Sequence, residues 1–223
     1  MTPTLPPEQL LNVFQQRSTA KAYDPTRKIA DADFAALLET ARLSPSSFGF
    51  EPWRFVVVQN PDVRALINEH AWGAKGKILD CSHFVLILVR QQNTLNADAA
   101  YIDHMMRTVH KLPEDIIAPR RETYRAFSQN DFDIDHDRAR YDWACKQSYI
   151  ALGNMLTAAA LLGIDATAVE GFPLETLHRL LTERGVYDGD TFKLSVMAAF
   201  GYRADAPRLK SRQSSSDVIA WCE

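Results

Sequence analysis

Two cations and two hydroxyl groups lie within five residues near the start of the chain. The segment Arg17-Ser-Thr-Ala-Lys21 offers the planar fork of an arginine, the neutral donors of Ser18 and Thr19, and the point charge of Lys21. This combination suits a phosphate group, because a guanidinium binds oxygen atoms in pairs and an ammonium adds charge. A solvated basic turn has the same composition, so the segment alone leaves both interpretations open.

Three further segments carry residue types that could contact a ligand. Ser44–Phe55 reads SPSSFGFEPWRF, a loop rich in hydroxyl groups that enters a strand through aromatic residues. Glu170–Pro173 precedes a helix whose first backbone N–H groups are unpaired, and Lys210–Arg212 places two cations in a polar tail. Each segment also has a simpler interpretation. The first can be a capped connection around a buried Trp53, the second an ordinary use of Gly and Pro before a helix, and the third a solvated tail.

Hydrophobic periodicity predicts the elements that would position these segments. We expect helices at 8–16, from an N-cap at Asp31 to about Pro45, at 135–162 and at 174–182. The stretch 96–130 is expected to be mostly helical, with breaks at Pro113 and Pro119. Strands are predicted at 54–59, 83–90 and 193–201. Since helices outnumber strands without regular alternation, the pattern indicates a layered α+β fold.

The composition is that of one globular domain. The chain has 223 residues, 46% of them hydrophobic, and a formal net charge of -3, which disfavours a nucleic-acid partner. Its three cysteines form no CxxC pair, so a zinc ribbon is excluded and a reducing compartment is favoured. The N-terminus does not resemble a secretory signal, and the apolar run 84–89 is too short to cross a bilayer. We therefore expect a cytoplasmic protein without a membrane partner.

Several other kinds of site are disfavoured by spacing. The acidic stretch Asp131–Asp142 resembles a calcium loop, but it has His136 where Gly is required and Asp142 where Glu is required. No HExxH, GxGxxG or GxSxG motif occurs, which argues against a zinc protease, a Rossmann dehydrogenase and an α/β-hydrolase. Cys81, at the entry to a strand, is expected to be a buried small hydrophobe. We predict no metal site.

Taken in order, five segments resemble the nitroreductase family of flavoproteins. They are RSTAKAYD, SPSSFGFEPWRF, GKILDCSH, AVEGFP and GYR…PRLKSR, and they run from about residue 10 to residue 213. The similarity is greatest to the oxygen-insensitive nitroreductase and dihydropteridine reductase branch. It implies one domain over 1–223 with a three-layer α/β/α fold, whose mainly antiparallel central sheet is flanked by helices. It also implies a homodimer with FMN at the subunit interface and a domain-swapped C-terminal arm at about 203–223.

The resemblance assigns cofactor contacts residue by residue. The expected contacts to the FMN phosphate, ribityl chain and pyrimidine edge are Arg17, Ser18, Thr19 and Lys21, with Lys210 and Arg212 closing on the phosphate. Lys77 is expected at the N1–C2 side of the flavin, and the backbone N–H groups of Glu170 and Gly171 at N5. Pro45, Ser46 and Ser47 are expected to come from the partner subunit.

Two departures from the family's usual pattern concern the edge of the site. Ala74 and Gly49 stand where the branch often has Asn, so one flavin contact is in doubt and the substrate mouth is expected to be more apolar. The expected acceptor-contacting residues are Phe48, Phe50 and Phe127.

The implied activity is electron transfer from NADH or NADPH through FMN to nitroaromatic, quinone or similar acceptors, in a ping-pong cycle. Lys21 and Lys77 would stabilise the negative charge of the reduced ring, and no side chain is expected to be catalytic. The alternative is a flavin-binding sensor or carrier without turnover. A site blocked by Phe48, Phe50 or Phe127 would favour this alternative.

Overall fold

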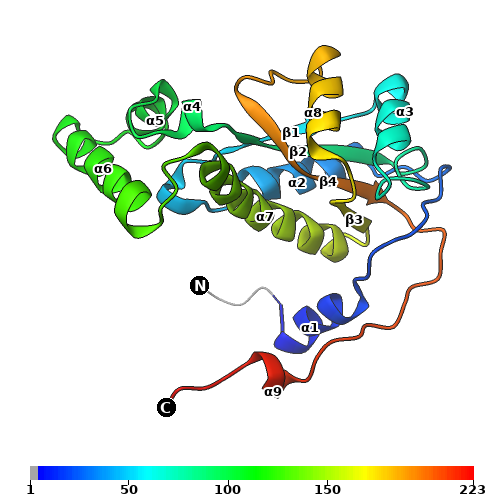
Figure 1. Cartoon of the computed structure of the whole chain (residues 1–223). Coiled ribbons are helices and arrows are strands. Elements are labelled where there is room, and N and C mark those ends of the chain that lie inside the picture. The colour runs from blue at the N-terminus through cyan, green and yellow to red at the C-terminus, as the bar shows by residue number, and fades with distance from the viewer. Residues whose placement is uncertain (1–4) are drawn as a thin grey trace.

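The computed structural model describes residues 5–223, and its centre is a four-stranded antiparallel sheet with the strand order β1-β2-β4-β3 (Figure 1). The strands are β1 (Trp53–Val57), β2 (His83–Arg90), β3 (Asp165–Val169) and β4 (Phe192–Gly201). Three of them were predicted to within two residues at each end. β3, an edge strand of sequence DATAV, was not predicted. The α+β class and the antiparallel sheet are confirmed.

Both faces of β2 are covered by helices, because its side chains are apolar without alternation. Phe84, Leu86 and Leu88 belong to one buried cluster, and Val85 and Ile87 belong to the other. Alternate residues of a strand point to opposite faces, so a run of apolar residues needs cover on both sides. The first cluster includes residues of α3 (Pro61–His70) and α8 (Leu174–Glu183), and the second includes residues of α2 (Asp31–Arg42) and α7 (Asp137–Leu161). The predicted three-layer arrangement is confirmed.

Helix starts differ from the prediction at two places. Asp31 is the first residue of α2 and Ala30 is its N-cap, so the predicted N-cap was wrong by one position. α3 was not predicted, because Asn60-Pro61 was interpreted as the end of a strand. In the structure Asn60 caps α3 by accepting from the backbone N–H groups of Asp62 and Val63, at 2.9 and 3.1 Å, and Pro61 begins the helix. Pro is well tolerated at that position because its missing N–H would have no partner in the helix.

A group of helices extends from one end of the sheet, at the left of Figure 1. It consists of α4 (Gln92–Leu95), α5 (Ala100–His104), the π-helix η2 (Met105–Val109), α6 (Glu114–Ala126) and the π-helix η3 (Phe127–Asp131). Pro113 is the N-cap of α6, but Pro119 lies inside that helix and does not break it, contrary to the prediction. Its missing N–H would have bonded to the carbonyl of Asp115, which is exposed and can be hydrated instead.

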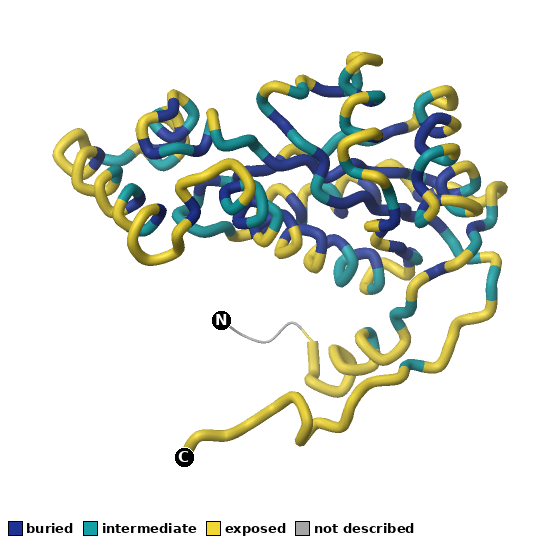
Figure 2. Tube along the Cα trace, in the orientation of Figure 1, coloured by how far each residue is buried: buried dark blue, intermediate teal, exposed yellow. Residues whose placement is uncertain are grey.

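The two terminal segments lie away from the layers. α1 (Pro7–Gln16) and the segment that contains α9 (Ser215–Val218) project below the sheet in Figure 1, and Figure 2 shows both as largely exposed. They meet where Tyr23 forms a β-bridge with Arg203 and where Lys210 Nζ donates to the carbonyl of Phe14. Residues 5–223 contain no helix that is both long and apolar enough to span a membrane.

Candidate functional site

A cavity of about 310 Å³ brings together three segments that are far apart in the sequence. Its lining residues are Thr19, Lys21, Trp72, Gly73, Lys77, Thr167, Ala168, Val169, Glu170 and Gly171. Five of these were predicted as cofactor contacts, namely Thr19, Lys21, Lys77, Glu170 and Gly171. The end of β3 supplies the floor between the N-terminal segment and the loop after α3. The strand that was not predicted is therefore the one that joins the predicted residues.

Buried hydrogen bonds hold the N-terminal segment against β3. The Thr167 hydroxyl donates to the carbonyl of Ala20 at 2.7 Å and lies 3.0 Å from the Tyr23 hydroxyl. Burial raises the pKa of Tyr23, so its phenol remains a protonated donor. Arg203 adds a bond from its guanidinium to the carbonyl of Ser18 at 2.7 Å. These contacts set the positions of Thr19 and Lys21, whose own side chains remain exposed.

The loop after α3 is fixed by a buried arginine. Arg64 is only 8% exposed, and its guanidinium donates to the carbonyls of Ile78 and Cys81 at 3.1 and 3.0 Å and to that of Val58 at 2.9 Å. One side chain thereby ties the loop to the end of β1. Cys81 is fully buried, as predicted, and burial raises the pKa of its thiol to about 11, so it is no nucleophile at neutral pH.

Lys77 is the half-buried cation of the cavity. Its Nζ donates to the carbonyl of Gly73 at 3.0 Å and to that of Lys75 at 3.3 Å. Burial lowers the pKa of Lys77, and the positive charge of Lys21 lowers it further. Two ammonium groups that repel each other at one cavity edge would both be stabilised by an anion placed between them.

Two aromatic residues beside the Glu170-Gly171 pair were not predicted. Trp72 is 74% exposed and lines the cavity, and a Cβ built on Gly171 would lie 2.7 Å from its ring. Tyr149 of α7 donates a hydrogen bond from its hydroxyl to the carboxylate of Glu170. The sequence marks Trp72 only as an aromatic residue shortly before Lys77, and nothing in the pattern of α7 distinguishes Tyr149.

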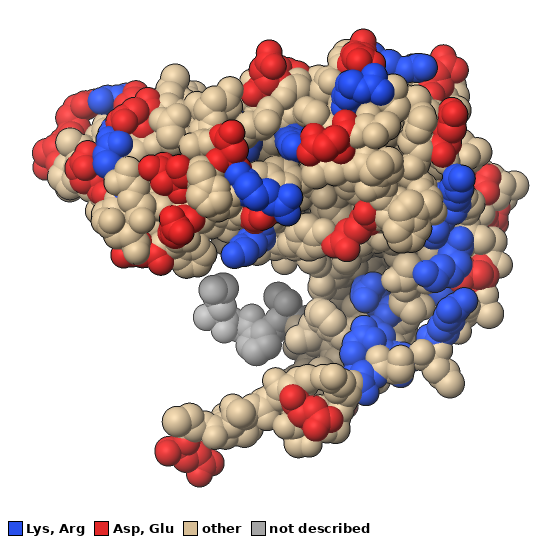
Figure 3. Space-filling model, viewed as in Figure 1, with Lys and Arg blue, Asp and Glu red and all other residues tan. Residues whose placement is uncertain are grey.

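A second cavity, of about 460 Å³, collects the remaining predicted cations. Arg17, Lys210 and Arg212 line it together with residues of α1 and α7. Figure 3 shows Lys and Arg side chains gathered where the terminal segments leave the body. Partial burial lowers the pKa of Lys210, and the charges of Arg17 and Arg212 lower it further. Ser18 lies next to this cluster in a third hollow that Arg17 also lines.

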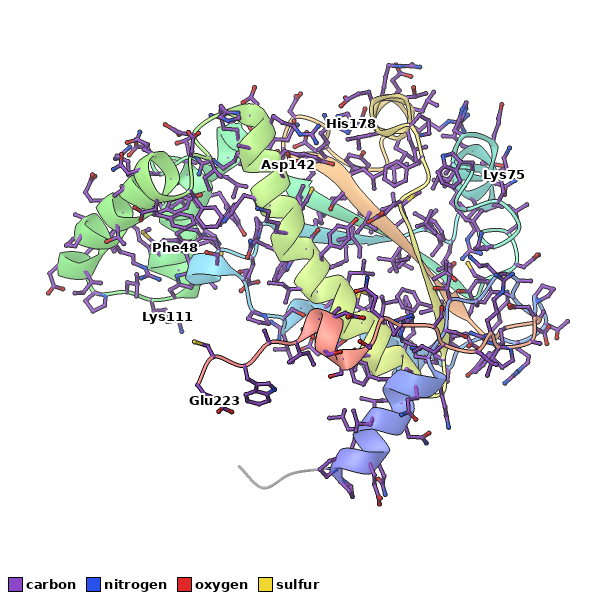
Figure 4. All side chains as sticks on the ribbon, turned by 60° about the horizontal axis from the view of Figure 1, so that its bottom comes forward. Phe48, Lys75, Lys111, Asp142, His178 and Glu223 are labelled. Carbon is purple, nitrogen blue, oxygen red and sulfur yellow. The ribbon has the colours of Figure 1, made fainter. Side chains whose placement is uncertain are left out.

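The loop of Pro45, Ser46 and Ser47 lies apart from these cavities. Figure 4 shows Phe48, which follows the loop, on the opposite side of the molecule from Lys75, whose loop carries Lys77. The loop is ordered by its own contacts: the Ser46 hydroxyl accepts from the backbone N–H of Glu51 at 2.8 Å, and the Ser47 N–H donates to Gln147 at 2.9 Å. A single chain does not bring the loop to the other predicted contacts.

The three predicted acceptor contacts lie together next to that loop. The Phe48 ring centroid is 5.6 Å from that of Phe50 and 5.1 Å from those of Phe127 and Tyr124. Phe50 is fully buried, whereas Phe48 and Phe127 are half-buried. Phe50 therefore supports Phe48 from below, and the accessible aromatic surface belongs to Phe48 and Phe127.

Comparison with known proteins finds matches in one family. Residues 14–202 match the family model described as "Nitroreductase family". A relative from Bacillus subtilis (strain 168), named "Putative NAD(P)H nitroreductase YfkO", is 45% identical over 214 residues, which are 96% of this chain and 97% of the relative. A similarly named relative from Staphylococcus aureus (strain N315) is 46% identical over 216 residues, 96% of each chain.

Two solved structures have the same fold. A "nitroreductase-like protein" from Streptococcus mutans superposes with a TM-score of 0.80 at 18% identity, covering 97% of this chain and 99% of that one. A protein from Exiguobacterium sibiricum 255-15, described as a "putative nitroreductase in complex with FMN", superposes with a TM-score of 0.74 at 19% identity, covering all of both chains.

Proposed function

The chain belongs to the nitroreductase family, and we propose on that premise that it is an FMN-dependent NAD(P)H oxidoreductase. Its acceptors are nitroaromatic compounds, quinones or similar small electrophiles, and the two substrates react in alternation. The observation that carries the proposal is the cavity that Thr19, Lys21, Lys77, Glu170 and Gly171 line together. Family resemblance assigned these residues to FMN, and the cavity joins them from three separate segments.

The donors at the two cavities fit the chemistry of FMN. Arg17, Lys210 and Arg212 form a cationic cluster suited to a phosphate, and Lys21 and Lys77 suit the electron-rich edge of the ring. Gly171 is buried, and no atom of residues 5–223 accepts a hydrogen bond from its N–H. Backbone N–H groups are nearly always paired, and Gly171 lines the cavity, so an acceptor atom of a ligand in the cavity would be the natural partner.

The chain's own residues would bind and tune the cofactor. When bound, FMN takes a hydride from NAD(P)H and supplies reducing equivalents to the acceptor. Lys77 is held in place by the carbonyl of Gly73, so its ammonium needs little reorganisation to stabilise negative charge at the adjacent ring edge. The Gly171 N–H would orient the ring, and Trp72 would form one wall of the site.

A homodimer would complete the site. The Pro45–Ser47 loop lines none of the cavities that hold the other predicted contacts, and Phe48 next to it lies across the molecule from Lys75 (Figure 4), so we infer that the loop reaches the FMN of the partner subunit. Large apolar side chains are exposed on the terminal segments, where a partner would cover them; they are Leu10, Leu11, Phe14, Ile219 and Trp221. In this proposal residues 1–223 form one domain whose arm, from about residue 203, crosses to the partner. Light scattering during gel filtration tests the dimer.

The first experiment on function is an absorption spectrum of the purified protein, followed by anaerobic addition of NADPH and then NADH. We expect flavin bands that bleach, and then recover when a nitroaromatic or a quinone is added. Bands that do not bleach would favour the flavin-binding carrier instead. A colourless protein that cannot be reconstituted with FMN would refute the proposal.

A further inference from the structure

One arginine of α6 lies over the aromatic surface next to the Pro45–Ser47 loop. The guanidinium carbon of Arg120 is 5.0 Å from the ring centroid of Phe48. Phe48 itself is held in a left-handed conformation, with φ at 58°, so its ring is presented by a strained backbone. Strain of this kind persists where the surroundings hold it, and it is common at ligand sites.

Arg120 differs from the other arginines of α6 in having no counter-charge. The guanidinium of Arg121 lies 2.5 Å from the carboxylate of Asp103, and that of Arg125 lies 2.8 Å from Asp98. Among residues 5–223, no carboxylate pairs with Arg120, and its guanidinium lies against the Phe48 ring alone. An exposed cation–π contact leaves the charge available, since it contributes only about 0.5–1 kcal/mol.

The helix that carries Arg120 is bounded on both sides by π-helical turns. η2 precedes α6 and η3 follows it, beginning at Phe127. Such turns occur frequently at functional sites, because the extra residue re-aims the neighbouring side chains. Here they frame a patch in which Phe48 and Phe127 offer flat apolar surface and Arg120 offers an unpaired positive charge at its edge.

We propose that Arg120 selects reactants that carry an anionic group when they occupy the open face of the partner subunit's FMN. The aromatic rings would stack on the planar part of the reactant, and Arg120 would bind its anionic group. That group is a carboxylate on an aromatic acceptor or the extra phosphate that distinguishes NADPH from NADH. The inference rests on the proposed function and on the placement of the Pro45–Ser47 loop at the partner's site.

The test compares paired reactants that differ by one anionic group, in Arg120→Gln, in Arg120→Lys and in the control Arg125→Gln. The acceptor pair is 4-nitrobenzoate and 4-nitrobenzamide, and the donor pair is NADPH and NADH in anaerobic stopped flow. For Arg120→Gln we expect about a fivefold loss of kcat/KM with the member of one pair that carries the extra anionic group, the upper range for an exposed ion pair. The member without that group should change by less than about twofold, and Arg120→Lys should recover much of the loss.

The outcomes distinguish an anionic group on the acceptor from the extra phosphate of NADPH. They also distinguish a failure of the role of Arg120 from a failure of the proposed function. A loss confined to 4-nitrobenzoate assigns the anion to the acceptor, and a loss confined to NADPH assigns it to the dinucleotide. Equal changes for the two members of each pair, or the same selectivity in Arg125→Gln, would overturn the inference. Arg120→Gln protein that is yellow and bleaches with NADH shows that the proposed function stands even then. Wild-type protein that cannot be reconstituted with FMN overturns both.

Discussion

Replacing Gly171 by alanine tests whether Trp72 and the Glu170-Gly171 pair form one wall of the site. The φ of Gly171 is not positive, so an alanine is compatible with its backbone. The obstacle is steric: the three atoms nearest to an added Cβ all belong to the Trp72 ring, at 2.7 to 2.8 Å. Carbon atoms normally approach to about 3.5–4.0 Å, so the ring and the backbone must separate by about 1 Å.

The cost of this substitution follows from how freely Trp72 can move. Overpacking a core costs about 1–3 kcal/mol, but this indole is 74% exposed and can swing outward. We therefore expect the free energy of unfolding of the apoprotein to fall by about 1 kcal/mol, at the lower end of that range. The dissociation constant of FMN should rise about fivefold or more, because the displaced Gly171 N–H no longer points at the ring.

A double-mutant cycle with Trp72→Ala tests whether the contact with Trp72 causes the effect of Gly171→Ala. Urea unfolding and FMN titration are measured for Gly171→Ala, Trp72→Ala and the double variant. In the Trp72→Ala background the added methyl group has room, so we expect Gly171→Ala to have almost no effect there, and the coupling energy should approach the full cost of about 1 kcal/mol. If Gly171→Ala lowers the free energy of unfolding equally in both backgrounds, the contact with Trp72 is not the reason why position 171 requires a glycine.

Three further substitutions test other parts of the site. Arg212→Ala should weaken FMN binding by about 1.5–3 kcal/mol, the contribution of a hydrogen bond to a charged group; FMN titration should show no such loss for Arg208→Ala, and an unchanged affinity in Arg212→Ala would remove the tail from the site. Lys77→Met should lower the midpoint potential of the bound flavin, measured by dye equilibration, whereas Lys75→Met in the same loop should not; equal potentials would mean that Lys77 points elsewhere. Tyr23→Phe should lower the free energy of unfolding by about 1–2 kcal/mol, because the buried Tyr23 hydroxyl lies 3.0 Å from both Thr167 and the carbonyl of Ala199. This loss corresponds to a fall of about 2–8 °C in Tm, and an unchanged Tm would contradict the buried hydrogen-bond network.

The fold could be predicted wherever one physical signal dominated. β2 was predicted at its observed bounds because FVLILV is a continuous apolar run between polar residues. β3 could not be recognised, since two of its five residues are alanines and it begins with Asp165. Its stability comes from pairing with β4, which is a tertiary contact. The prolines at 61 and 119 show the same limit, because the effect of a proline depends on its position within a helix.

The candidate site could be predicted as a set of residues but not as a geometry. Resemblance named Lys77 and Gly171, and the cavity holds both. It did not indicate Trp72 or Tyr149, because exposure and a contact between distant segments leave no local pattern. Phe50 was expected to contact the acceptor, and its burial could not be predicted, since the turn at Phe48 sends the two rings to different depths. Whether the Pro45–Ser47 loop reaches a partner stays a prediction.

The contacts between the two ends of the chain determine when, during translation, the site can form. Ser18 is held by Arg203, and the backbone N–H of Lys21 donates to Asp205 at 3.1 Å, so the first cofactor segment is fixed by residues about 185 positions later. A ribosome must translate past Asp205 before Lys21 can be fixed in place. It must translate past Arg212 before the cationic cluster of Arg17, Lys210 and Arg212 can form. With the cofactor contacts proposed above, cofactor loading would follow synthesis of the chain. Nascent chains that stall earlier would carry no flavin, which would let fluorescence of the bound flavin report completed molecules alone.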